Sequence, residues 1–190
     1  MAIGKHNVSH RTWSKDNYLI STDPALIPIP ELNAAFASDM VYWATALPED
    51  VMREMLNNSL CFGVYALPQD DGDTTNGDAS EDYKLTGFAR AITDFTTFLY
   101  LTDVYIAPPH QRQGLGTWLV KCVQEVIAEM PHLRRSMLFT YDWKRGVPFY
   151  EKLMGMGLME CRKPGEGEEG VGAAVMQWKG PTFPDKLKHT

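Results

Sequence analysis

A polar turn bracketed by two glycines stands directly before a long amphipathic segment. The stretch HQRQGLGTWLV covers residues 110–120, and its glycines are Gly114 and Gly116. The first N–H groups of a helix have no partner within the helix, and the helix dipole adds about half a positive charge there. Glycines let the backbone bring such N–H groups close to a ligand. We therefore interpret the turn as a phosphate cradle, to which Arg112 adds a cation and Thr117 a hydroxyl group.

The same two glycines are compatible with a turn that binds nothing. Many helices begin after a glycine because the chain must change direction there. The segment is not a Walker loop, since GLGTWL contains no Lys-Ser/Thr pair, and it lacks the third glycine of the dinucleotide-binding fingerprint. The turn by itself leaves both interpretations open.

The segment after the turn has the apolar spacing of a helix. Its apolar residues recur in steps of three and one, which places them on one stripe at a period near 3.6 residues. They are Leu115, Trp118, Leu119, Cys122, Val123, Val126, Ile127 and Met130. Pro131 ends the pattern, so we expect a helix over residues 114–130.

Apolar runs rich in β-branched and aromatic residues predict strands on both sides of this helix. The expected strands are 17–22, 60–67, 84–93, 97–107 and 134–142, with helices at 30–45, 48–58 and 147–157 and a last hairpin from 158–163 and 173–179. This order predicts that the strands at 97–107 and 134–142 lie parallel, with the helix between them as their crossover. We expect one α/β (α+β) domain over residues 1–190, a mixed central sheet with helices on both faces.

The formal net charge of −6 is concentrated in one segment. The stretch DDGDTTNGDASED, residues 70–82, carries six acids and no base, so the rest of the chain has no net charge. This balance excludes an overall basic field of the kind that binds nucleic acid. We interpret residues 68–83 as an acidic loop between two strands, and attraction of cationic substrates is the alternative.

The three cysteines form no CxxC pair, and their number is odd. Their separations fit no zinc module, so we expect reduced thiols and no metal site. The N-terminal stretch MAIGKHNVSHRTWSK lacks the apolar run of a secretory signal, and no apolar run approaches the roughly 20 residues that span a bilayer. We expect a soluble, cytoplasmic protein with no membrane partner.

The turn resembles the acetyl-CoA signature of the GNAT acetyltransferase superfamily, which is Gln or Arg, two residues, Gly, one residue, then Gly or Ala. Gln111, Gly114 and Gly116 occupy these positions after the expected strand YLTDVYIAPP. Downstream, FYEKLMGM resembles the family segment YEKLGF, and the order of strands agrees. The resemblance covers roughly residues 60–160. Two positions depart from it: Gln111 stands where many relatives have Arg, and Leu-Met-Gly-Met replaces Leu-Gly-Phe.

The resemblance implies the GNAT fold and acetyl-CoA (coenzyme A) as cofactor. It also implies direct transfer of the acetyl group to an amine while both substrates are bound. The strand at 103–106 is then expected to bend away from its neighbour and pair with the pantetheine arm, and an N–H near Val104 or Tyr105 to stabilise the oxyanion. The implied cofactor-binding residues are Val104, Tyr105, Ile106, Gln111, Arg112, Gln113, Gly114, Leu115, Gly116, Thr117 and Asp142.

Two catalytic residues are implied by the same resemblance. Tyr150 matches the tyrosine that commonly protonates the leaving thiolate in this family, and a core aromatic is the alternative. Asp103 lies in an otherwise apolar strand where cofactor and acceptor are expected to meet, which makes it the candidate general base. A hydrogen bond to a neighbouring turn is the other interpretation of Asp103. Asp94 and Asp142 are further candidates for the base.

The expected acceptor is a small-molecule amine, aromatic or small aliphatic. The segments that would surround it are rich in aromatic residues, namely Phe36, Tyr42, Trp43, Phe95 and Phe98. A monomer or homodimer is expected. The rival hypothesis is a non-catalytic acyl-CoA-binding or regulatory module that keeps the GNAT fold but lacks an acceptor site. A phosphate- or nucleotide-binding protein is a third hypothesis.

Overall fold

The computed structural model describes residues 10–68, 83–167 and a part of the chain beyond, namely 169–170, 172, 175–177, 179–181, 183–184 and 187. The predicted acidic loop lies outside the described residues except at its two ends. The chain divides into two compact units, Met1–Leu138 and Phe139–Thr190, and each is described by itself. A single domain over residues 1–190 stays a prediction.

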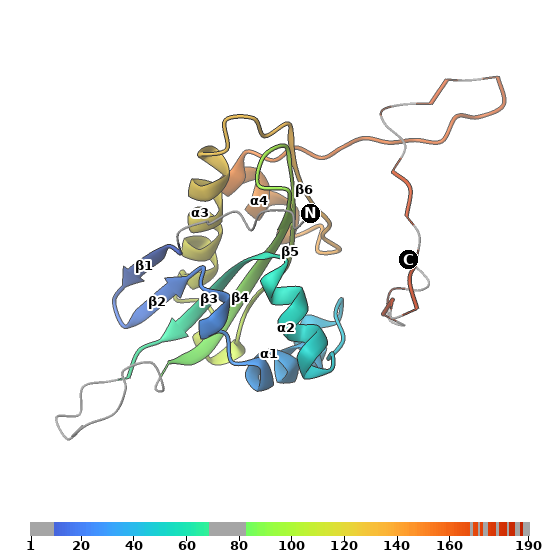
Figure 1. Cartoon of the computed structure of the whole chain (residues 1–190). Helices are drawn as coiled ribbons and strands as arrows, with labels where there is room; N and C mark the ends of the chain where they lie inside the picture. The colour runs from blue at the N-terminus through green and yellow to red at the C-terminus, as the bar shows by residue number, and fades with distance from the viewer. Residues whose placement is uncertain are drawn as a thin grey trace, which may run out of the picture. The chain divides into compact units, whose positions relative to one another are not determined.

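A six-stranded sheet forms the centre of the first unit, with its strands in sequence order (Figure 1). Neighbouring strands are antiparallel except β5 and β6, which are parallel as predicted. The strands are β1 (Thr12–Lys15), β2 (Tyr18–Ser21), β3 (Leu60–Ala66), β4 (Lys84–Thr93), β5 (Phe98–Ile106) and β6 (Arg135–Leu138). The predicted strands at 60–67, 84–93 and 97–107 are therefore confirmed. β6 covers only the first part of the strand predicted at 134–142.

The first strand of the sheet, β1, has no counterpart among the predicted strands. Its sequence TWSK contains a single large apolar residue, Trp13, so no alternating pattern is visible. β1 pairs with β2 through a two-residue turn at Asp16 and Asn17. Asp16 has a φ of 49°, a conformation that aspartate tolerates and that tight hairpin turns require.

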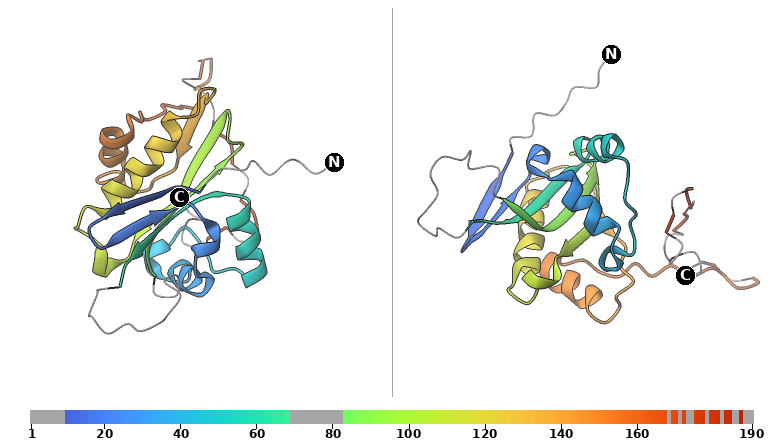
Figure 2. Two further views of the ribbon diagram at one scale, coloured as in Figure 1. Left: turned by 60° about the vertical axis from the view of Figure 1, so that its left-hand side comes forward. Right: turned by 90° about the horizontal axis from the view of Figure 1, so that it is seen from below.

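Helices cover both faces of the sheet, as Figure 2 shows for α1 and α2 on one side and α3 on the other. The first unit contains α1 (Ile29–Phe36), α2 (Glu49–Asn57) and α3 (Leu115–Ala128), and the second unit contains α4 (Gly146–Met154). Both α1 and α2 begin next to a proline, whose fixed φ suits the first turn of a helix. The mixed sheet with helices on both faces confirms the predicted fold class.

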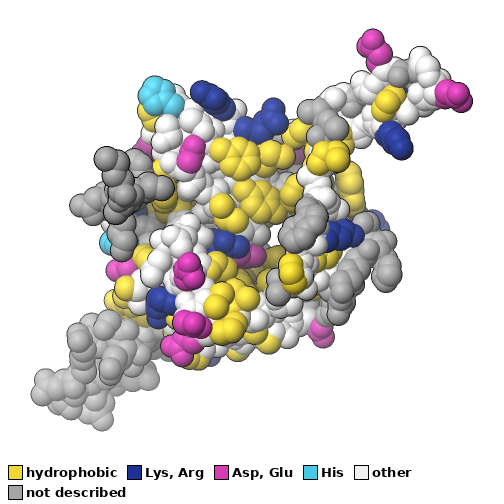
Figure 3. All heavy atoms as spheres, turned by 45° about the vertical axis from the view of Figure 1, so that its right-hand side comes forward, with side chains coloured by type: hydrophobic (Ala, Val, Ile, Leu, Met, Phe, Trp, Pro, Cys, Tyr) yellow, Lys and Arg dark blue, Asp and Glu magenta, His cyan; other side chains and the backbone are white. Residues whose placement is uncertain are grey.

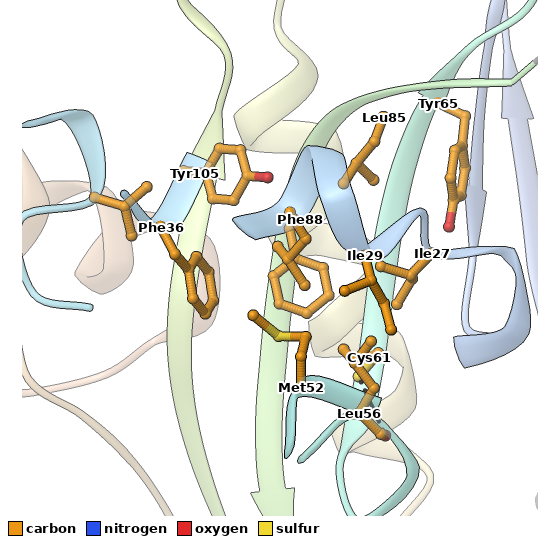
Figure 4. Packing of buried hydrophobic residues seen from close by; sticks show 12 residues of the cluster. Ile27, Ile29, Phe36, Met52, Leu56, Cys61, Tyr65, Leu85, Phe88 and Tyr105 are labelled. Carbon is orange, nitrogen blue, oxygen red and sulfur yellow. Dashed lines mark hydrogen bonds between the residues drawn. The ribbon is translucent and has the colours of Figure 1, made fainter. Parts of the chain in front are cut away.

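α3 is the crossover between the parallel strands β5 and β6, as the apolar spacing predicted. Six of the eight predicted stripe residues are buried, while Trp118 and Met130 are half-buried. On the other face of the sheet, α1 and α2 pack over a core that includes Phe36, Met52 and Phe88 (Figure 4). The rings of Phe36 and Phe88 meet edge to face with their centroids 6.5 Å apart. This contact ties α1 to the middle of β4.

The predicted last hairpin does not form in the described residues of 158–163 and 173–179. Only Arg162 forms an isolated β-bridge there. The intervening sequence KPGEGEEGVG is rich in residues that disfavour strands.

Two further observations concern the part of the chain that the structure describes. None of its helices is long and apolar enough to cross a membrane. Nor does it bring three or more His, Cys, Asp or Glu side chains together in a way that could hold a metal ion.

Candidate active site

A β-bulge interrupts the pairing of β4 with β5. Phe88 pairs with Tyr105 and Arg90 with Thr102, so two residues of β5, Asp103 and Val104, lie opposite the single residue between them on β4. Asp103 has a φ of 54°, the left-handed conformation that aspartate adopts more readily than most residues. The bulge inserts one extra residue and bends β5 at this point.

The bulge changes which face of the sheet the side chains of β5 point to. Before it, Leu101 lies opposite Ala91, and both are buried outside the core cluster under α1 and α2. After it, Tyr105 lies opposite Phe88 and belongs to the core under α1 and α2. Asp103 is thereby turned to the α2 side, although the simple alternation of a strand would place it on the same face as Leu101.

β5 loses its second neighbour close to the bulge. Pairing with β6 ends at Leu101 and Leu138, so the segment from Thr102 to Ile106 has β4 on one edge and no described strand of the first unit on the other. Such an edge presents backbone groups that can pair with an extended ligand. The side-chain amide of Gln111 donates to the carbonyl oxygen of Ile106 at 2.8 Å, which fixes the end of this segment.

The carboxylate of Asp103 is buried and paired. Its side chain is 6% exposed, and its Oδ2 accepts a hydrogen bond from Arg90 Nε at 2.7 Å. Its Oδ1 accepts a longer bond, 3.2 Å, from the hydroxyl of Thr102. Arg90 Nη1 also donates to Ser59 Oγ at 3.2 Å, just after the end of α2. The ion pair therefore links the bulge to the neighbouring strand and to α2.

The loop before α3 is tight and ends in a glycine that the backbone requires. Gly114 stands at the N-terminus of α3 with a φ of 80°, and Arg112 also has a positive φ, of 62°. Conformations of this kind gather N–H groups into concave anion-binding sites. Gly114 has no side chain that could cap α3, and no other side chain caps it. The first turn of α3 also contains no acidic residue.

Gly116 is not required by packing within the protein. A Cβ atom at this position would meet only Ile106 Cγ1, at the ordinary contact distance of 3.8 Å. The backbone N–H groups of Leu115, Gly116 and Thr117 are the ones that a helix leaves without intrahelical partners, since the first bond runs from Trp118 N to Gly114 O at 3.0 Å. Space and unpaired donors thus coincide at the start of α3, which fits a phosphate group.

The remaining predicted loop residues divide by exposure. Gln111, Arg112 and Gln113 are exposed and Thr117 is half-buried. Leu115 is buried, so its side chain belongs to the core and only its backbone could contact a ligand. The other predicted strand residues, Val104 and Ile106, are half-buried on the edge described above.

Asp94, a further candidate base, forms the turn between β4 and β5. Its Oδ1 accepts hydrogen bonds from the backbone N–H groups of Thr96, Thr97 and Phe98, and its Oδ2 accepts one from the Thr97 hydroxyl. The bond with the Thr97 hydroxyl is the largest of the causes that hold the pKa of Asp94 below its usual value. The carboxylate of Asp94 therefore stabilises the turn between β4 and β5.

The second unit contains Asp142 and Tyr150. Asp142 accepts hydrogen bonds from Arg145 N at 2.9 Å and Arg145 Nε at 2.8 Å, which lower the pKa of Asp142. Tyr150 lies in α4, with its ring edge to face with Phe149 at 5.1 Å between centroids. Burial raises the pKa of Tyr150 to about 12.

The sequence matches the acetyltransferase (GNAT) family over residues 35–156, which is more than half of the chain. The chain belongs to the GNAT acetyltransferase family. A Gibberella zeae protein classed among the acetyltransferases is 39% identical over 173 residues, which cover 90% of this chain and 94% of that protein.

Solved structures agree with the family assignment. A GNAT-family protein from Xanthomonas campestris pv. campestris is 28% identical, with a TM-score of 0.56 over 80% of this chain and 96% of that chain. A Deinococcus radiodurans protein classed among the acetyltransferases is 19% identical, with a TM-score of 0.51 over 86% and 100% of the two chains. At that lower identity the likeness shows the fold alone.

Sequence reasoning missed several residues of this GNAT acetyltransferase. Arg90 holds the carboxylate of Asp103 and itself donates to Ser59, but both residues come from other elements and no local pattern marks them. Tyr18 contacts the loop before α3 and was likewise not predicted. Phe36, expected near the acceptor, is buried in the core, while Tyr42 and Trp43 form a half-buried edge-to-face pair.

Proposed function

We propose that this GNAT acetyltransferase transfers an acetyl group from acetyl-CoA to the amine of a small molecule by direct attack, with both substrates bound. The observation that carries the proposal is the edge of β5 beyond its pairing with β6, which lies beside the uncapped start of α3. The edge of β5 can form backbone hydrogen bonds with a pantetheine arm, and the start of α3 can donate N–H groups to a diphosphate. Acetyl-CoA, when bound, supplies the acetyl group as a reactive thioester.

The backbone of the first unit binds and orients the cofactor in this proposal. The N–H groups of Leu115, Gly116 and Thr117 bind the diphosphate, and Arg112 and Gln113 lie beside it. Val104 and Ile106 pair with the pantetheine arm along the free edge of β5. An N–H of Val104 or Tyr105 donates to the carbonyl oxygen as negative charge develops on it, which is worth about 3 kcal/mol for a well-placed donor.

Two side chains handle protons. Tyr150 keeps its hydroxyl proton at neutral pH because burial raises its pKa to about 12, so it can protonate the leaving thiolate. Asp103 takes the proton of the attacking amine, directly or through a water molecule. Its Oδ1 is the available oxygen, since its only described partner is the 3.2 Å bond from Thr102. Asp142 stays a proposed contact of the pantetheine amides.

An acetyl-cysteine route through Cys61 or Cys122 is disfavoured by the raised pKa of these two buried thiols. Burial raises the pKa of both Cys61 and Cys122 to about 12. The thiolate is the nucleophilic form of cysteine, so neither residue is suited to accept the acetyl group.

A small amine is favoured over a nucleic acid by the charge pattern of the face that Figure 3 shows. In the view of Figure 3, Lys and Arg side chains are scattered among acidic and hydrophobic ones instead of forming one basic area. The proposed enzyme is cytoplasmic and is a monomer or homodimer. The alternative is an acyl-CoA-binding module without an acceptor site.

The first test is calorimetric titration with acetyl-CoA of the wild type, Gly116→Glu and Gly116→Ala. Glutamate in the first turn of α3 favours the helix by about 0.3–1 kcal/mol, because of the helix dipole, but repels a diphosphate. We expect Gly116→Glu to fold normally and to lose acetyl-CoA binding, while Gly116→Ala keeps it. No binding by a folded wild type would remove the proposal. Binding without transfer to any amine in a broad panel would favour the non-catalytic alternative.

A further inference from the structure

The cofactor loop carries no positive charge at the first position of its signature. Gln111 occupies the position where the family signature also allows arginine, and its amide is held by the carbonyl oxygen of Ile106. The loop thus retains Arg112 as its own cation. A diphosphate carries two negative charges, so a second cation near the start of α3 would strengthen binding.

The β1–β2 hairpin is anchored to this loop. The hydroxyl of Tyr18 donates to Gln113 Oε1 and also lies within hydrogen-bond distance of His110 Nδ1, both at 3.0 Å. The rings of Tyr18 and His110 meet edge to face, with centroids 5.8 Å apart. Three contacts from one side chain therefore fix the hairpin beside the loop.

A second set of contacts holds the same hairpin to the outer side of α3. Trp13 Nε1 donates to Glu125 Oε2 at 2.8 Å, and the guanidinium of Arg11, just before β1, pairs with Glu129. The hairpin is thus attached near the N-terminus of α3 and again further along the helix.

Lys15 is the cation that this arrangement brings to the loop. Lys15 pairs directly with Tyr18 across the hairpin, so both side chains leave the same face. A Cβ atom at Gly114 would lie 3.8 Å from Lys15 Nζ, the one described contact within 4 Å outside its chain neighbours and its own helix backbone. Among the described residues no carboxylate forms an ion pair with Lys15. Within the described residues, its ammonium group is therefore not neutralised by a carboxylate at the start of α3.

We propose that Lys15 binds the diphosphate of acetyl-CoA and supplies from β1 the positive charge that Gln111 does not provide. The inference rests on the proposed function, since it requires the cofactor to occupy the loop before α3. It assigns the β1–β2 hairpin a part in the cofactor site although Lys15 lies 99 residues before Gly114.

The test is calorimetric titration with CoA and with 3′-dephospho-CoA, which keeps the diphosphate, for the wild type and three variants. Lys15→Met removes the charge and keeps most of the side chain, Lys15→Arg restores the charge, and Lys121→Met is a matched control on the exposed side of α3. We expect Lys15→Met to weaken both ligands about fivefold, and the other two variants to stay within about twofold of the wild type. Affinity of Lys15→Met should also depend less on salt concentration.

Each other outcome has a distinct meaning. Equal affinity of Lys15→Met and wild type for both ligands would overturn the inference and leave the cofactor site in place. If Lys15→Met weakens binding of CoA but not of 3′-dephospho-CoA, Lys15 contacts the 3′-phosphate, and its assignment to the diphosphate is overturned. A folded wild type that binds neither ligand would instead overturn the proposed function.

Discussion

At the scale of one residue, removal of the Tyr150 hydroxyl group tests the proposed chemistry most directly. A thiolate with a reference pKa of about 8.5 leaves more readily when it is protonated, and Tyr150 retains its proton because its pKa is raised to about 12. We expect Tyr150→Phe to lower kcat about 100-fold while the Kd for acetyl-CoA, from calorimetry, changes less than about twofold.

A matched control for this prediction is Tyr141→Phe, which removes the hydroxyl of an exposed tyrosine in the same unit. It should leave kcat unchanged. The wild type should show no loss of kcat from ionisation of Tyr150 up to about pH 10, since the acid form persists below its pKa. Equal kcat values for Tyr150→Phe and wild type across this pH range would exclude the proton-donor role.

The lowered pKa of Asp94 makes the free energy of unfolding depend on pH. Hydrogen bonds, first the one from the Thr97 hydroxyl, hold the pKa of Asp94 below the unfolded value of about 3.9. A lowered folded-state pKa stabilises the fold above the unfolded pKa, and this stabilisation is lost as pH falls through the folded pKa. We expect the wild type to lose stability between about pH 4 and pH 2, and Asp94→Asn to lose less over the same range. Urea unfolding at several pH values measures the difference, and identical slopes would contradict this role of Asp94.

At the scale of elements, the bulge in β5 does two things at once. It turns Asp103 to the α2 side of the sheet, and it lies where β5 continues beyond its pairing with β6. The ion pair of Asp103 with Arg90 holds the bulged residue in place, because the two groups come from the two strands that the bulge separates.

This arrangement predicts strong coupling between Arg90 and Asp103. Removing one partner of a buried ion pair costs about 3–5 kcal/mol, since the other charge is left buried without a partner. We expect Arg90→Met and Asp103→Asn each to destabilise the protein by an amount of that order, asparagine being chosen because it tolerates a positive φ. The double variant should lose less than the sum of the two in urea unfolding. Additive losses would mean that the two side chains do not stabilise one another.

Elements with a strong periodic pattern were predictable, and those defined by distant contacts were not. The spacing in α3 and the apolar runs of β4 and β5 are local signals, so their positions followed from sequence. β1 carries one large apolar residue and forms because β2 offers it a free edge. The register shift opposite Asp103 leaves no mark in the sequence, because it depends on how two strands separated by a turn pair with each other.

The same distinction holds for the candidate site. The loop at 111–116 could be recognised because glycines at a fixed spacing are a property of the backbone that binds the ligand. Arg90 and Lys15 could not, since each comes from a strand far in sequence from the residue that it approaches, and no local pattern marks it.

At the scale of the whole molecule, the cysteines differ sharply in their surroundings. Cys61 and Cys122 are buried in the first unit, whereas Cys161 is exposed in the second. Alkylating reagents act on thiolates that they can reach, so the folded wild type should be modified at Cys161 alone. The natural chain therefore carries a single attachment point for a fluorophore, on the second unit. The emission of a fluorophore attached at Cys161 can be followed while CoA is titrated into the labelled protein, without any engineered cysteine.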